Sequence, residues 1–320
     1  MKKFIPLFIF FGIVIYFYLN FLGPVGWSKD EKTFIVPKNQ EGFDTAQALL
    51  EGNFIKNKKT FDFFKAVFLL GNIQSGGYML RNNMSAWDVL KKINGNPDLV
   101  WISYSSCLRK EQIGEILASN LGWSPAELEK WNTVYTNTKP EYFEGVYYPD
   151  TYLIPRNETG DKIAQRLINR FNEKFAPYAE KYIAANIRWV TGLKIASLIA
   201  REAAGKQDMH LISGIIWNRL NEDMPLQIDA TMQYTLGKNK EGKWWGSIDL
   251  GEKSNESPYN SYLHKGLPPT PICSANIEYI EAALNPSETD CIFYLHDNEQ
   301  GIHCAKTYEE HLQNIKTYLD

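Results

Sequence analysis

The sequence predicts an α+β protein with an N-terminal transmembrane helix and two folded parts. Three observations predict this class. An uncharged apolar run covers residues 4–22, segments typical of strands and of amphipathic helices alternate through the rest of the chain, and a polar stretch at residues 132–140 separates two parts. The 320 residues, 44% of them hydrophobic, are enough for two domains with their own cores.

The apolar run at residues 4–22 approaches the length that a helix needs to cross a bilayer. The alternative is a cleaved signal peptide, which normally has a shorter apolar core followed by a cleavage site of small residues. Here Gly23-Pro24-Val25-Gly26-Trp27 follows. We therefore expect a retained anchor. Lys2 and Lys3 place residues 1–3 in the cytoplasm by the positive-inside rule, so the body of the chain should lie outside the cytoplasmic membrane.

The first folded part, residues 30–135, has the pattern of a small α+β unit. Its clearest helix signal is Ser85, an N-cap residue followed by Asp88 at the third helical position. Asn94-Gly95 should end that helix. The predicted elements are strands at 34–37, 78–80 and 101–104, and helices at 45–50, 85–94, 109–121 and from 124.

The second part, residues 140–320, is predicted to be a mixed α+β domain with long loops, whose central helix at 193–204 carries Glu202. We expect helices at 161–185, 193–204 and 209–220, a helix capped by Ser274 that ends at Asn285-Pro286, a strand pair at 291–296 and 302–305, and a terminal helix from Tyr308. Residues 225–272 are rich in Pro, Gly, Asn and Ser, and are predicted to form loops. Structureless loops of this length are usually functional.

Charge and cysteine content exclude several classes of function. The net charge is −3 without a basic stripe, so the sequence predicts no nucleic-acid partner. The histidines are scattered and no metal-binding spacing occurs, so we expect no metal ion. The cysteines show no disulfide framework, and we expect no disulfide on which the fold depends. Cys291 and Cys304 would face each other only if the hairpin turn lies at Asp297-Asn298.

One carboxylate occupies an apolar position. The predicted helix carries Ile195, Leu198 and Ile199 on one stripe, and the next place on that stripe is Glu202. Burial there would raise its pKa and keep it protonated, which is the state that a general acid requires. The alternative is that Glu202 forms an ion pair with an arginine such as Arg219. Helical spacing alone leaves both open.

The residues around Glu202 resemble a known family. The segment Ala196-Ser197-Leu198-Ile199-Ala200-Arg201-Glu202 is similar to the catalytic helix of the YceG-like family, the endolytic murein transglycosylases. Further segments match in order: Glu144-Gly145, Pro149-Asp150-Thr151-Tyr152, Asn218-Arg219-Leu220, Leu226-Gln227-Ile228-Asp229-Ala230-Thr231, Ser257-Pro258-Tyr259-Asn260-Ser261-Tyr262, Gly266-Leu267-Pro268-Pro269-Thr270-Pro271-Ile272, Ala282-Ala283-Leu284-Asn285-Pro286, Lys306-Thr307 and Glu310-His311. The chain departs from the family at Ala200, where a glutamate is frequent, which favours Glu202 as the essential carboxylate.

The resemblance implies a membrane-anchored lytic transglycosylase. Such an enzyme cleaves the β-1,4 bond between N-acetylmuramic acid and N-acetylglucosamine of nascent peptidoglycan and leaves 1,6-anhydro ends, with Glu202 as catalytic acid and no cofactor. It also implies a LysM-like subdomain within residues 30–135, a YceG-like catalytic domain at 140–320, termination of glycan elongation, and cell-wall synthases as candidate partners.

The resemblance also suggests supporting residues. The candidates for substrate binding or for orienting the acid are Gln227, Asp229, Thr231, Tyr259, Asn260, Tyr262, Asn218 and Glu144. For the loop residues the alternative is ordinary loop-stabilising hydrogen bonding. Glu144 and Asp150 are the fallback acids, and Trp244 and Trp245 are expected to pack in the interior more than to contact sugar.

Two competing interpretations remain at this stage. One is a non-catalytic glycan-binding protein with a degenerate enzyme domain, which the retained Glu202 and loop motifs disfavour. The other is a structural component of the cell-wall synthesis machinery. It is compatible with an enzyme that trims strands beside glycan polymerases.

Overall fold

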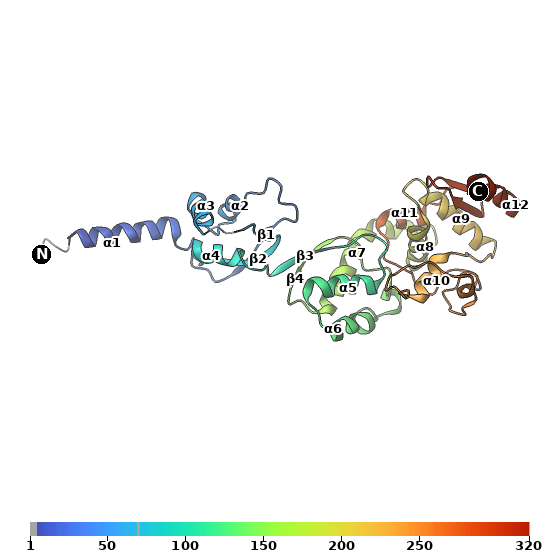
Figure 1. Ribbon diagram of the computed structural model, residues 1–320, viewed down its shortest axis with the longest axis horizontal. Coiled ribbons are helices and arrows are strands. Elements are labelled where there is room, and N and C mark those ends of the chain that lie inside the picture. The colour runs from blue at the N-terminus through green and yellow to red at the C-terminus, as the bar shows by residue number, and fades with distance from the viewer. Residues whose placement is uncertain (1–4, 69–70, 320) are drawn as a thin grey trace. The chain divides into compact units, whose positions relative to one another are not determined.

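The computed structural model describes residues 5–68 and 71–319 (Figure 1). Its chain forms two compact units, one of residues 1–102 with 151–158, and the other of residues 103–150 with 159–320. The described part is a mixed α+β structure, as the sequence predicts. The expected cytoplasmic tail, residues 1–3, lies outside the described residues.

The N-terminal segment is helical. Helix α1 covers Ile5–Phe17 and continues as a π-helical turn at Tyr18–Leu22. Within the described residues, no single helix reaches the length and apolar character that a membrane span requires. The apolar segment Gly12–Leu22 is shorter than a span, and one sharply bent pair, Gly160–Ala184 with Trp189–Glu202, meets the criterion only when its two helices are taken together.

The first unit packs three helices on a twisted sheet. The strands lie in the order β1-β2-β3-β4, and β1 pairs with β2 in antiparallel register. Phe34 and Val36 of β1 are buried while Ile35 between them is exposed, which is the alternation of a half-buried strand. The elements are β1 (Glu31–Val36), α2 (Thr45–Glu51), α3 (Lys58–Val67), β2 (Gly76–Arg81), α4 (Ala86–Ile93), β3 (Leu99–Ser103) and β4 (Thr151–Pro155).

Helix α4 confirms the predicted N-terminal signal. The Ser85 side chain accepts a hydrogen bond from the Asp88 backbone, and the Asp88 side chain accepts one from the Ser85 backbone, so the capping box is complete. Val89, Leu90 and Ile93 on its inner face enter the core of the unit. The sequence did not predict α3 or β4.

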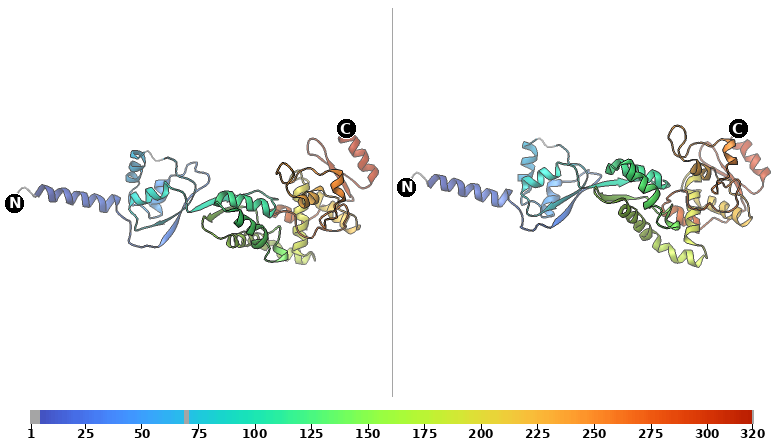
Figure 2. Two further views of the ribbon diagram at one scale, coloured as in Figure 1. Left: turned by 60° about the horizontal axis from the view of Figure 1, so that its bottom comes forward. Right: turned by 90° about the horizontal axis from the view of Figure 1, so that it is seen from below.

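The second unit is built mainly from helices. Its elements are α5 (Lys110–Leu121), α6 (Pro125–Lys130), a π-helical turn (Trp131–Tyr135), a 3-10 turn (Pro140–Tyr142), α7 (Gly160–Ala184), α8 (Trp189–Glu202), α9 (Met209–Asn221), α10 (Asp229–Leu236), a 3-10 turn (Leu250–Ser254), α11 (Ile277–Leu284), β5 (Phe293–His296), β6 (Ile302–Ala305) and α12 (Tyr308–Tyr318). Helix α8 packs against α7, α9, α10 and α11. Figures 1 and 2 show α12 beside the β5–β6 hairpin at the C-terminal end.

The polar stretch at residues 132–140 is not where the structure divides the chain. Trp131 is fully buried, its ring lies 5.5 Å from that of Tyr147, and its indole N–H donates to the Lys110 carbonyl at 2.8 Å. Gly114 lies so close that an added Cβ would sit 2.5 Å from the Trp131 ring. These contacts join residues 103–135 to the second unit. The chain passes between the two units near residues 102, 150 and 158, and not at residues 132–140.

Two local predictions are also corrected. Asn276, rather than Ser274, caps α11, because its side chain accepts from the backbone of Glu278 and Tyr279. Ser274 is buried and its backbone pairs with Leu108. The predicted loop at 225–272 contains α10, whose polar, weakly periodic sequence gave no helix signal.

The four cysteines form two disulfides, Cys107–Cys273 and Cys291–Cys304. The sequence predicts no disulfide on which the fold depends, and its cysteine spacing gave no sign of the two bonds that the structure contains. The Cys291–Cys304 bond joins the segment before β5 to β6. The turn lies at residues 297–301 and Tyr294 stands opposite Cys304, so the two cysteines form a bond without being directly opposed, and the expected condition of a turn at Asp297-Asn298 is wrong. The Cys107–Cys273 pair is buried, and the two segments are also joined by a backbone bridge between Leu108 and Ser274.

Candidate active site

Glu202 is the last residue of α8, and the predicted stripe is confirmed. Ile195, Leu198 and Ile199 are fully buried, and the half-buried Glu202 continues their face. The helix ends here because Ala203 has an extended conformation. The Glu202 carboxyl therefore lies at the border between the core of the unit and its surface, where a proton donor is both desolvated and accessible.

Tyr294 of β5 contacts the Glu202 carboxyl directly. Its hydroxyl donates to Glu202 Oε2 at 2.5 Å. Burial raises the pKa of Glu202, and the negative charge of Asp229 raises it further, while the hydrogen bond from Tyr294 opposes this change. Burial and the neighbouring Glu202 raise the pKa of Tyr294 well above its usual range, so Tyr294 keeps its proton. The pair therefore holds a carboxyl with a raised proton affinity in a fixed orientation.

The same strand also fixes the segment that follows α8. His296 lies on the same face of β5 as Tyr294, two residues along, and its Nε2 lies 2.8 Å from Asp208 Oδ2. The buried Asp208 accepts hydrogen bonds from the backbone N–H groups of Ala204 and Gly205. One strand thus holds both the acid and the turn beyond it.

Arg219 does not pair with Glu202, which excludes the alternative that the sequence left open. Its guanidinium donates to the carbonyl oxygens of Ile292 and Leu226, each at 2.6 Å, and lies over the Phe293 ring. Among the ion pairs of the described residues, none involves Glu202. Arg219 instead ties the start of β5 to the loop before α10.

Asp229 lies near Glu202 and carries its own network. It is the exposed first residue of α10, and it accepts a hydrogen bond from the Tyr262 hydroxyl. Lys253 lies 3.4 Å from its carboxylate and donates to the Tyr262 hydroxyl at 2.8 Å. Asp229 and Tyr262, two of the predicted residues, therefore contact each other, and the charge of Asp229 acts on the Glu202 carboxyl.

Three other loop candidates lie in the scaffold of that network. Thr231 is buried and bonds to the Ile228 carbonyl and the Ser261 hydroxyl. Asn260 is buried and donates to the carbonyl oxygens of Lys253 and Asn255. Gln227 has an exposed side chain, a left-handed backbone with φ 54°, and a backbone N–H that donates to the Ser261 carbonyl.

Tyr259, Asn218 and Glu144 make contacts elsewhere. Tyr259 packs on Tyr234 with ring centroids 5.0 Å apart, and bonds to Thr270. Asn218 donates to the carbonyl oxygens of residues 289 and 291, and lines a cavity of about 960 Å³ between α9 and the chain around residue 287. None of the three has a described contact with Glu202.

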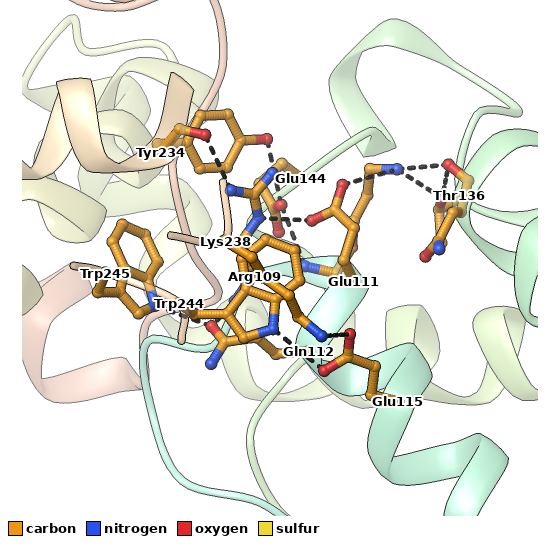
Figure 3. A network of polar contacts seen from close by, with 12 residues as sticks. Arg109, Glu111, Gln112, Glu115, Thr136, Glu144, Tyr234, Lys238, Trp244 and Trp245 are labelled. Carbon is orange, nitrogen blue, oxygen red and sulfur yellow. Dashed lines mark hydrogen bonds and ion pairs between the residues drawn. The ribbon is translucent and has the colours of Figure 1, made fainter. Parts of the chain in front are cut away.

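Glu144 is the centre of a second polar network (Figure 3). Its fully buried carboxyl accepts from the backbone N–H groups of Lys110 and Gly145, and burial with the nearby Glu111 raises its pKa to about 8. The other fallback acid, Asp150, forms an ion pair with Arg170. Because Glu144 is enclosed, it is not placed to protonate a sugar polymer.

Trp244 and Trp245 border this network. Both are half-buried and donate their indole N–H groups to side chains of α5, Trp244 to Glu115 and Trp245 to Gln112 (Figure 3). Trp245 also lies under the guanidinium of Arg201, 4.2 Å from its ring centroid.

Sequence reasoning missed Tyr294, His296 and Asp208. Tyr294 lies 92 positions from Glu202, and nothing local marks a tyrosine in a short strand as a partner of a distant carboxyl. Within the described residues, no cluster of three or more His, Cys, Asp or Glu side chains is arranged to hold a metal ion.

Comparison with known proteins identifies the family to which the chain is similar. The profile of the YceG-like family matches residues 34–317. The endolytic murein transglycosylase of Bacillus subtilis is 27% identical over 94% of this chain and 88% of its own length. The protein of the same name from Streptococcus pneumoniae is 25% identical over 92% of this chain, which spans only 59% of that relative.

A solved structure supports the same conclusion at the level of the fold. The crystal structure of a yceG-like protein from Listeria monocytogenes superposes with a TM-score of 0.61 at 24% identity, over 89% of this chain and 99% of that one. Since the family profile matches most of the sequence, including both units, this chain is a member of the YceG-like family.

Proposed function

We propose that the chain is an endolytic murein transglycosylase with Glu202 as its catalytic acid. The observation that carries this proposal is the Glu202 carboxyl, which ends an apolar helix stripe, has a raised pKa and is held by Tyr294. The relatives named as endolytic murein transglycosylases support the substrate, which is the peptidoglycan glycan strand.

The proposed mechanism needs one acid. Glu202 donates its proton to the oxygen of the β-1,4 bond between N-acetylmuramic acid and N-acetylglucosamine, and the glucosamine part leaves with a new hydroxyl. The C6 hydroxyl of the muramyl ring attacks C1, its proton returns to Glu202, and a 1,6-anhydro ring closes. No water is consumed. Ordinary glycosidases need a second carboxylate, whereas an intramolecular nucleophile is already positioned.

Asp229 and Tyr262 are the supporting residues closest to this chemistry. The negative Asp229 raises the pKa of Glu202 and so favours the protonated acid. Tyr262 and Lys253 hold Asp229. Gln227, two residues before α10, offers an exposed amide that is suited to sugar hydroxyl groups. Thr231 and Asn260 support the segments that carry these groups. Asn218, Tyr259 and Glu144 have structural roles in other parts of the unit.

We also propose an anchored enzyme whose body lies outside the cytoplasmic membrane. Helix α1 exposes apolar side chains such as Phe10, Ile13 and Ile15, which supports an anchor at residues 4–22. The two disulfides support an oxidising compartment. In this arrangement the LysM-like subdomain lies within residues 30–135 and the catalytic domain at residues 140–320. Nascent strands are cut near the membrane, which ends their elongation, and cell-wall synthases are the candidate partners.

The test is turnover of purified glycan strands by the wild type, Glu202→Gln and the control Glu222→Gln, which removes an exposed carboxyl at the end of α9. Glu202→Gln should lose activity by at least about 100-fold, the scale of a lost general acid, and the control should retain it. A wild type that binds strands without cutting them would support the glycan-binding alternative instead.

A further inference from the structure

Arg201 stands beside the catalytic acid without a polar partner. Its side chain is half-buried, and burial lowers its pKa. Within the described residues, no hydrogen bond or ion pair uses its guanidinium, and its Nε is enclosed and unsatisfied. The enclosed Nε is costly, because a desolvated charged group is normally compensated by a partner, whereas the two terminal amino groups also lack a partner but are not enclosed. Arg201 can therefore bind a ligand that supplies the missing hydrogen-bond acceptor.

The face of the Arg201 guanidinium is already occupied. Trp245 lies 4.2 Å away in cation–π geometry, and Gln112 fixes its indole by accepting the N–H at 2.8 Å (Figure 3). Stacking uses the face of the guanidinium and leaves its two terminal amino groups free in the plane, while Nε is enclosed. These form a rigid fork that matches a carboxylate in two parallel hydrogen bonds.

Arg109 provides an internal comparison. It stacks in the same way, 4.6 Å from the Trp244 ring, but its N–H groups are used by the Glu111 carboxylate and the Tyr234 carbonyl. The stacked Arg109, which has a structural role, is thus paired with a carboxylate of the chain itself, Glu111. The chain supplies no such carboxylate to Arg201, the residue next to the catalytic Glu202.

We propose that Arg201 binds a carboxylate carried by the 3-O-lactyl arm of the muramyl residue that is being cleaved. This inference rests on the proposed function, since it assigns a part of the same substrate. The lactyl arm is attached to the ring whose C1 reacts, and it ends either in its own carboxylate, in peptide-free strands, or in a stem peptide that carries carboxylates. Both sources present the same chemistry to the arginine.

The experiment measures binding without cleavage. Glu202→Gln and Glu202→Gln/Arg201→Gln are titrated with peptide-free strands, with the same strands after conversion of their carboxylates to methylamides, and with peptide-bearing strands. Arg201→Gln should weaken binding of at least one carboxylate-bearing strand about tenfold, and should leave the methylamide strands within about twofold. Loss on peptide-free strands assigns the lactyl carboxylate, and loss confined to peptide-bearing strands assigns the stem peptide.

Two variants serve as controls. Arg188→Gln removes the same charge from an exposed arginine of the same unit and should not change binding. Arg201→Lys keeps the charge but loses the fork, so it should bind carboxylate strands with intermediate affinity, and it replaces the glutamine variant if that one does not fold. Equal losses on methylamide and carboxylate strands, or no loss at all, would overturn the proposal. Because binding is measured in the Glu202→Gln background, failure of the wild type to cut strands would refute the function and leave this result standing.

Discussion

Replacement of Tyr294 by phenylalanine tests how the acid is controlled. The change removes the hydroxyl that donates a hydrogen bond to Glu202 Oε2 at 2.5 Å, and keeps the ring in place. A hydrogen bond to a charged group contributes about 1.5–3 kcal/mol. If Glu202 carries roughly half of its negative charge in the transition state, the loss is about 0.8–1.5 kcal/mol, or about fourfold to twelvefold in kcat.

Tyr294→Phe should also shift the pH–activity profile in a definite direction. The hydroxyl stabilises the ionised carboxylate, so its removal raises the pKa of Glu202 and leaves the acid protonated to higher pH. Arg201, Asp229 and His296, which also act on Glu202, are retained in the variant. The alkaline limb of the kcat/KM profile should therefore move to higher pH while kcat at the optimum falls.

The assay is strand cleavage followed across the pH range, with Tyr308→Phe as control. That change removes an exposed hydroxyl beside the same hairpin, next to Phe293. Full activity with an unmoved alkaline limb in Tyr294→Phe would refute the role of the hydrogen bond. A loss of activity with an unmoved limb would mean that Tyr294 supports only the packing.

The remaining predictions concern stability and topology. Burial raises the pKa of Glu202 above its ordinary value of 4.5. The stability that the protonated carboxyl contributes is therefore complete below pH 4.5 and is lost as the pH rises through the pKa of the folded state. The melting temperature of Glu202→Gln, relative to that of the wild type, should increase with pH above about 4.5. Loss of the Cys107–Cys273 disulfide, which spans 166 positions, should lower the free energy of unfolding by about 5 kcal/mol, and loss of Cys291–Cys304, which spans 13, by about 3 kcal/mol. Denaturant unfolding of the two double Cys→Ser variants measures both losses, and a larger loss for the Cys291–Cys304 variant would contradict this prediction. Protease added to intact spheroplasts should digest the body of the chain, and complete protection would contradict an anchor at residues 4–22.

Local signals predicted much of the fold. The capping box at Ser85 and the helical stripe that ends at Glu202 depend on neighbours within one or two turns, and both are present in the structure. Helix α10 was missed because tertiary packing, with Ala230 and Met232 buried, stabilises a segment of weak periodicity. The division of the chain was misplaced because the burial of Trp131 cannot be inferred from the polar residues that follow it.

The surroundings of the acid could be predicted only in part. Asp229 was proposed to support Glu202, and its charge acts on that carboxyl, while Tyr262 contacts Asp229. Tyr294 and Asp208 were not expected, because their roles depend on how β5 docks on the end of α8, which is a long-range arrangement without a local pattern. The disulfide between Cys107 and Cys273 could not be predicted for the same reason, since the two cysteines lie 166 positions apart.

Mass analysis of the products of purified glycan strands tests the central claim most directly. If Glu202 alone protonates the bond and the C6 hydroxyl attacks, wild-type products should end in 1,6-anhydro-muramyl groups, lighter than hydrolysed ends by one water, and Glu202→Gln should form almost none. Products that end mainly in reducing muramic acid would show that water is the nucleophile, which requires a second carboxylate with Asp229 as the nearest candidate. Near-wild-type turnover by Glu202→Gln would contradict the assignment of the acid itself.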